Sequence, residues 1–82
     1  MKEYNMSVTV YYLGVLSEIT GKSTELIDET GTKEQILEIL LDMHPGLKKL
    51  NFVLSLNGTI THGDKEINSG DQVTLIPPVP GG

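Results

Sequence analysis

One stretch of this chain has the periodicity of a helix, and it limits the folds open to the rest. Thr32 and Gln35 stand three residues apart, as the two side chains of an N-terminal capping box do. Apolar residues then recur at helical spacing, at Ile36, Ile39, Leu40 and Met43, with Leu37 and Leu41 widening the stripe. Pro45 ends the pattern, because the residue before a proline is driven out of the helical region. The sequence therefore predicts one amphipathic helix whose apolar face packs on a sheet.

The segments on either side of this helix have strand patterns. In 7–13, β-branched and aromatic residues place Val8, Val10 and Tyr12 on one face. The other predicted strands are 23–28, 52–56, 59–61 and 72–76. Asn57-Gly58 is a strong hairpin signal. The connection 15–19 has room for a turn of helix, and 62–66 is predicted to be a polar loop followed by an isolated apolar anchor, Ile67.

The order of these elements predicts an α+β fold. A chain of 82 residues forms one small domain with two layers, and this order is too short for a doubly wound sheet. We expect a mixed sheet of four to five strands on one main helix, with the first and last strands parallel at its centre. Such a domain has no room for a deep cleft, so a role carried by its surface or terminus is favoured over an enzyme with its own pocket.

The last six residues, Pro77-Pro78-Val79-Pro80-Gly81-Gly82, do not fit the compact domain. Three prolines exclude a helix or a central strand, so this segment is predicted to be an extended tail, 77–82, after a domain that spans 1–76. Two glycines without Cβ leave the terminal carboxylate on a thin strip of backbone that suits a narrow slot. The carboxylate of Gly82 is the candidate reactive group, and it needs activation because it is ionised at neutral pH. The composition equally allows a frayed terminus without a role.

Charge and cysteine content exclude several classes of function. The net charge is −5 without a lysine cluster, so nucleic acid and anionic membranes are disfavoured and a basic protein partner is a better expectation. The absence of cysteine excludes a disulfide framework, a thiolate metal site and a side-chain persulfide. His44 and His62 lack neighbours at metal-ligand spacing, so both are predicted to be surface residues without a role, and no bound cofactor or metal is expected. No signal peptide or spanning stretch is present, which predicts a cytoplasmic protein.

The exposed side of the predicted helix carries like charges. Glu34, Glu38 and Asp42 follow one another at intervals of four residues. Such pairs repel slightly, by about 0.2–0.5 kcal/mol each. We interpret this side as solvated, in preference to a docking stripe.

The C-terminal third resembles a known family. The residues that carry the likeness are Leu56-Asn57-Gly58, Ile67-Asn68-Ser69-Gly70-Asp71-Gln72-Val73 and the ending Ile76 to Gly82. The chain is similar to the ubiquitin-like sulfur carriers, most closely to the small subunit of molybdopterin synthase. The Pro-Pro-Val-x-Gly-Gly ending is the specific part.

The resemblance implies a β-grasp (ubiquitin-like) fold and a cycle on Gly82. A ubiquitin-activating-like adenylyltransferase uses ATP to adenylate the Gly82 carboxylate, and a sulfurtransferase converts it to a thiocarboxylate. The tail then enters the large subunit of molybdopterin synthase, where sulfur passes to a precursor of the molybdenum cofactor. In this picture Ile76, Pro77, Pro78, Val79, Pro80 and Gly81 bind partners. The chain is non-catalytic alone, since the family's active residues lie on the large subunit.

Three departures from the family pattern leave the pathway open. Ile76 stands where relatives commonly have Phe, Pro80 replaces a small residue, and the arginine that many relatives carry is missing from Val15-Leu16-Ser17. A sulfur carrier for thiamine, a tungsten cofactor or cysteine would have the same scaffold. So would a ubiquitin-like modifier that is conjugated to lysines through Gly82.

Overall fold

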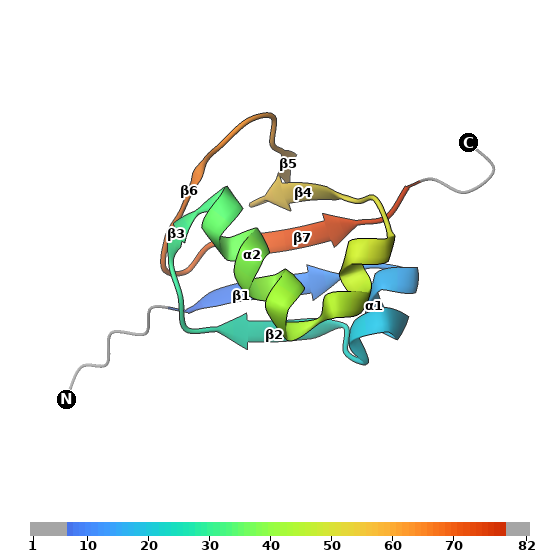
Figure 1. Ribbon diagram of the computed structural model, residues 1–82. Coiled ribbons are helices and arrows are strands. Elements are labelled where there is room, and N and C mark those ends of the chain that lie inside the picture. The colour runs from blue at the N-terminus through green and yellow to red at the C-terminus, as the bar shows by residue number, and fades with distance from the viewer. Residues whose placement is uncertain (1–6, 79–82) are drawn as a thin grey trace.

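The computed structural model describes residues 7–78, which form a mixed sheet with one main helix across one face (Figure 1). The elements are β1 (Val8–Tyr12), α1 (Val15–Thr20), β2 (Thr24–Ile27), β3 (Gly31–Thr32), α2 (Lys33–Met43), the 3₁₀-helix η1 (Pro45–Lys49), β4 (Val53–Leu56), β5 (Thr59–Ile60), β6 (Glu66–Ile67) and β7 (Gln72–Ile76). The expected α+β, β-grasp arrangement of a five-stranded sheet on one main helix is confirmed.

The first and last of the long strands lie side by side at the centre of the sheet. The strand order is β2-β1-β7-β4-β5, and β1 runs parallel to β7 with Val10 opposite Val73. β2 pairs antiparallel with β1, and β4 pairs antiparallel with β7. The prediction that the first and last strands lie parallel at the centre is therefore confirmed, and the last strand has a hydrogen-bonded neighbour on each side.

One face of this sheet and the inner side of α2 form the core. Val8, Val10 and Tyr12 of β1 are buried as the alternation predicted, and Val73 and Leu75 of β7 lie in the same layer. The remaining core side chains are Leu16, Ile27, Ile36, Leu40, Leu47, Leu54 and Ile67, with Leu37, Ile39 and Leu41 packed against them. The acidic residues of α2, Glu34, Glu38 and Asp42, are exposed, as expected for a solvated side.

The start of α2 matches the predicted capping box. The Thr32 hydroxyl oxygen accepts a hydrogen bond from the Gln35 amide at 3.1 Å, and the Gln35 side-chain oxygen accepts one from the Thr32 amide at 2.9 Å. At the other end the prediction was wrong in one residue, because Met43 is 44% exposed. Leu47 of η1, which is fully buried, packs in the core after the helix ends.

The short elements agree with the sequence prediction only in part. The 15–19 connection, which has room for a turn of helix, is a helix of six residues, α1, that buries Leu16. Other elements were not predicted. The 3₁₀-helix η1 begins at Pro45, and β6 covers the end of the predicted polar loop and its anchor Ile67, where it pairs with Gly31 of β3. Strands of two residues have almost no local signal, because they are stabilised only by a partner far away in sequence.

A polar cluster joins β1, β2 and the end of α2. Tyr12 donates a hydrogen bond to Glu25 Oε1 at 2.7 Å, and His44 Nε2 lies 2.8 Å from the same oxygen. Lys22 Nζ lies 3.2 Å from Glu25 Oε2. The His44 ring also meets Tyr12 edge-on, with centroids 5.6 Å apart. The prediction of His44 as a surface residue without a role was therefore wrong, because the β1–β2 register places Glu25 beside the C-terminal end of α2.

The cluster shifts the pKa values of two of its members. Burial by itself would raise the pKa of Glu25, but the hydrogen bonds from His44, Tyr12 and Lys22 outweigh burial and lower it. Burial, and then the hydrogen bond to the Glu25 carboxylate, raise the pKa of Tyr12 far above its usual range. The folded state thus favours an ionised Glu25 and a neutral Tyr12.

The free energy of unfolding should therefore fall at both ends of the pH scale. Stability contributed by Glu25 is present above its unfolded pKa and is lost as the pH falls through its lower folded pKa. Stability contributed by Tyr12 is lost as the pH rises above about 10, where the unfolded state releases its proton. Urea unfolding at a series of pH values measures this dependence. Glu25→Gln should reduce the fall in the free energy of unfolding at acid pH and lower that free energy by about 1.5–3 kcal/mol at pH 7. Tyr12→Phe should reduce the fall at alkaline pH.

Glu38→Gln is the matched control, because Glu38 is an exposed carboxylate on α2. It should leave the fall in the free energy of unfolding unchanged at both acid and alkaline pH. If Glu25→Gln and Glu38→Gln reduced the fall at acid pH equally, the cluster would contribute nothing specific.

Candidate functional site

The tail begins where β7 leaves the sheet. Ile76, the last residue of β7, lies opposite Val53 of β4 and is partly buried. Pro77 is partly buried and Pro78 is exposed. Val79, Pro80, Gly81 and Gly82 lie outside the described residues. The structure therefore places three of the predicted site residues and brings them together at one end of the sheet (Figure 1).

A turn at Gly14 supports the first residue of the tail. The Leu13 amide donates to the Leu75 carbonyl at 3.2 Å and carries the β1–β7 ladder one residue beyond the strand. Gly14 then turns the chain into α1 with φ 54° and ψ −132°, a conformation that favours glycine. A β-carbon added at Gly14 would lie 3.4 Å from Pro77 Cγ, so Pro77 rests against this turn. In the sequence, Gly14 is only the residue that follows the strand predicted at 7–13.

On its β4 side, the start of the tail borders a shallow groove. The groove has a volume of about 110 Å³ and is lined by Asn51, Phe52, Val53, Ile76, Pro77 and Pro78. Leu13, Val15 and Val53 are each more than two-fifths exposed near the same end. We call Leu13, Val15, Val53, Ile76 and Pro77 the tail base. Apolar side chains thus flank the point where the tail departs.

Among residues 7–78, the strand residues on the sheet face opposite α2 carry no charge. Strand alternation places on this face Thr9, Tyr11, Thr24, Leu26, Val53, Ser55, Ile60, Gln72, Thr74 and Ile76. None of them is ionisable at neutral pH, although 21% of the chain is charged. Interface centres are depleted of charged residues, because burying an unpaired charge is costly. Ile76, at the end of the central strand β7, thus belongs to a sheet face that is suited to contact with another protein.

Residues 7–78 hold little that could perform chemistry. Within them no group of three or more histidine, aspartate and glutamate side chains is placed to hold a metal ion. His62 is exposed, as predicted, and His44 belongs to the cluster around Glu25. None of the described helices is long and apolar enough to cross a bilayer. The geometry is that of a scaffold that presents its C-terminal segment.

Comparison with known proteins identifies the family. The ThiS family pattern matches residues 10–82, which is most of the chain. The chain belongs to the ThiS family. The resemblance to the ubiquitin-like sulfur carriers is thereby confirmed.

Solved structures share the fold of this ThiS-family chain. A putative molybdopterin converting factor subunit 1 from Pyrococcus furiosus matches with a TM-score of 0.82 at 23% identity, over 90% of this chain and 99% of that one. SAMP1, a small archaeal modifier protein of Haloferax volcanii, matches at 0.80 and 25% identity, over 93% and 99%. A chain from the complex of subunits 1 and 2 of the molybdopterin-converting factor of Helicobacter pylori matches at 0.69 and 28% identity, over 94% and 100%.

The turn beneath the tail offers a test of how the tail is supported. Gly14→Ala should lower the free energy of unfolding by about 1–3 kcal/mol, because it forces an L-residue into a rare backbone conformation and adds a methyl group beside Pro77. It should also change the amide chemical shift of Ile76. Urea denaturation and amide NMR spectra measure the two effects.

Gly21→Ala is the matched control. Gly21 has φ 79° and ψ 11°, with nothing within 4 Å of an added β-carbon. It should cost about 1 kcal/mol and leave the Ile76 amide unchanged. Equal costs, together with an unmoved Ile76 amide in both variants, would contradict the support of Pro77 by Gly14.

Proposed function

We propose that this chain is a sulfur carrier whose Gly82 becomes a thiocarboxylate and donates sulfur to a molybdopterin precursor within molybdopterin synthase. The observation that carries the proposal is a Gly-Gly sequence at 81–82, four residues after the end of a central strand in a ThiS-family scaffold. One solved relative comes from a complex of the two subunits of a molybdopterin-converting factor, which supports a large-subunit partner here. We place this activity in the cytoplasm.

The proposed cycle begins with the Gly82 carboxylate, which is a poor electrophile until it is activated. An oxygen of the Gly82 carboxylate attacks the α-phosphorus of ATP on an adenylyltransferase, and pyrophosphate leaves. A persulfide on a sulfurtransferase then attacks the carbonyl carbon and displaces AMP. A thiol cleaves the resulting acyl disulfide, which leaves sulfur on Gly82 and joins the thiol to the sulfurtransferase sulfur in a disulfide. The resulting thiocarboxylate is a strong nucleophile where the carboxylate was a weak one. This chain supplies the terminal group and its presentation, and the enzymes of the cycle supply the catalysis.

The residues around the tail have complementary roles in this proposal. The tail base gives a partner an apolar contact next to the point of insertion. Pro77, Pro78 and Pro80 restrict the backbone, so less conformational entropy is lost when the tail enters a tunnel. Gly81 and Gly82 have no side chains and therefore fit the narrowest part of such a tunnel. Ile76 offers a smaller apolar surface than the phenylalanine common in relatives, which bears on the choice of partner.

A second candidate is a ubiquitin-like modifier that is conjugated to lysines through Gly82. The likeness to SAMP1 favours it, since that protein is a small archaeal modifier with the same fold. The activated intermediate would be the same acyl adenylate. The final nucleophile would be a lysine amine of a target protein in place of sulfur.

Intact mass spectrometry of the protein from its native cells tests the carrier. We expect a fraction in which one oxygen is replaced by sulfur, and fragmentation should place the change at Gly82. Deleting Gly82 should abolish it. If only the free carboxylate appears after incubation with ATP, an activating enzyme and a sulfur source, the carrier proposal is wrong.

The modifier makes a different prediction in the same cells. Tryptic peptides of other proteins should then carry C-terminal residues of this chain on lysine side chains. Such adducts without any thiocarboxylate would favour conjugation over sulfur transfer.

A further inference from the structure

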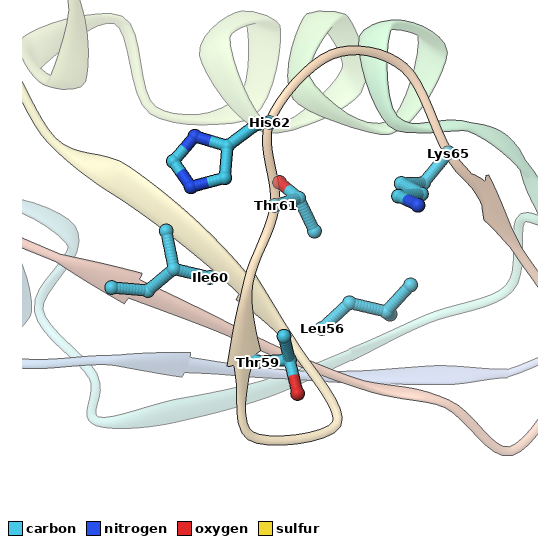
Figure 2. Close-up of a pocket in the computed structure, with 6 residues that line it drawn as sticks. All are labelled: Leu56, Thr59, Ile60, Thr61, His62 and Lys65. Carbon is cyan, nitrogen blue, oxygen red and sulfur yellow. The ribbon is translucent and has the colours of Figure 1, made fainter.

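A hollow of the described surface lies away from the start of the tail, beside the β4–β5 hairpin (Figure 2). Its volume is about 450 Å³, within the range of pockets that bind ligands. The lining residues are Leu56, Thr59, Ile60, Thr61, His62 and Lys65. We call it the hairpin pocket. In Figure 2 the side chains of Ile60 and Leu56 stand on opposite sides of Thr61, and His62 and Lys65 lie on the two flanks of the loop.

The charge of the hairpin pocket is opposite to that of the protein. Acidic residues outnumber lysines by 11 to 6 in the chain, yet none of the six lining residues is acidic. Lys33 donates to the Thr61 hydroxyl at 2.8 Å and adds a second ammonium group next to the lining. Within residues 7–78, the side chains of Lys65 and His62 have no hydrogen-bond or ion-pair partner. The Lys65 and His62 side chains are therefore available to bind a carboxylate.

The acidic residues nearest in sequence do not neutralise Lys65. Asp64 Oδ1 accepts hydrogen bonds from the backbone amides of Lys65 at 3.1 Å and Glu34 at 3.4 Å, so this carboxylate is held at the start of α2. Glu66 is exposed in β6, next to the buried Ile67, and within residues 7–78 no ion pair joins its carboxylate to Lys65. The lining of the hairpin pocket therefore contributes the positive charge of Lys65 without a paired carboxylate.

A sheet edge adjoins this pocket. β5 is the last strand of the five-stranded sheet, and the Thr61 amide donates to the Leu54 carbonyl. Because hydrogen-bonded and non-hydrogen-bonded pairs alternate in an antiparallel ladder, Ile60 and Ser55 form a non-hydrogen-bonded pair. The N–H and C=O of Ile60 thus point away from β4. An extended chain laid along β5 can pair with these two groups and gain the rest of its affinity from side chains.

The hairpin pocket is separate from the tail. In the β4–β7 register, Val53 lies opposite Ile76 but Leu56 lies opposite Val73, so the pocket end of β4 is roughly 10 Å back along β7. β5 is also two strands away from β7. A ligand at the pocket leaves the tail base uncovered.

We propose that the hairpin pocket is a docking site for an extended acidic and apolar segment of a partner protein. The side chains of an extended segment alternate between the two faces of the sheet, so one apolar side chain lies against Ile60 and the next lies against Leu56. The backbone of the segment pairs with Ile60, and its flanking carboxylates meet Lys65 and His62. This site goes beyond the function of Gly82 and does not depend on it. It allows a partner to hold the carrier while the tail is engaged elsewhere.

Three capped seven-residue peptides test the site, each with an Ile-Val-Ile centre flanked by Glu, Gln or Lys. Titrated into the isotope-labelled full chain, the Glu-flanked peptide should shift the amides of Leu56, Ile60, Thr61 and Lys65 and leave Ile76 unmoved. It should bind about tenfold more tightly than the Lys-flanked peptide. Lys65→Glu should weaken its binding about tenfold.

Lys48→Glu is the matched control, since it makes the same charge change on η1, away from the hairpin pocket, and should leave affinity within about twofold. Equal weakening in both variants would mean nonspecific attraction and overturn the proposal. So would an absence of saturable shifts with the Glu-flanked peptide, or shifts centred on the tail base. Hexanoate is a further probe, and if it binds as tightly as the peptide, the pocket takes small carboxylates and not a segment of a protein.

Discussion

The parallel pairing of β1 with β7 is the contact on which the rest of the structure depends. It places the last described strand between two neighbours, β1 and β4, in the middle of the sheet. The buried side chains of both strands supply much of the core, and Leu13 extends the same ladder to the turn that supports Pro77. Core packing and tail presentation thus have a common origin.

The parts of this arrangement that could be predicted were those with local causes. The capping box of Thr32 and Gln35 and the alternation of Val8, Val10 and Tyr12 are patterns within a few residues, and both are confirmed. β3 and β6 could not be predicted, because two residues have little propensity of their own and these strands exist only as a pair. His44 was misjudged for a similar reason, since its partner Glu25 is 19 residues away and is brought near by strand register.

For the candidate site, the sequence predicts the tail, and the structure shows which residues surround the start of the tail. The prolines and glycines after Ile76 identify a segment that cannot join the sheet. That Pro77 rests against Gly14 depends on a backbone turn and on the β1–β7 register, neither of which has a sequence signature of its own. The hairpin pocket also assembles from β4, β5 and the following loop, and His62 and Lys65 had appeared only as polar loop residues.

The central place of β7 has a mechanical consequence. A force that pulls on the tail acts along the axis of β7, whose hydrogen bonds join it to β1 on one side and to β4 on the other. A pull along this axis loads the hydrogen bonds in shear, so they resist together, whereas a pull across the strand would break them one at a time. This arrangement suits the insertion that we propose for the tail, because the fold behind the tail stays intact when the tail is drawn out.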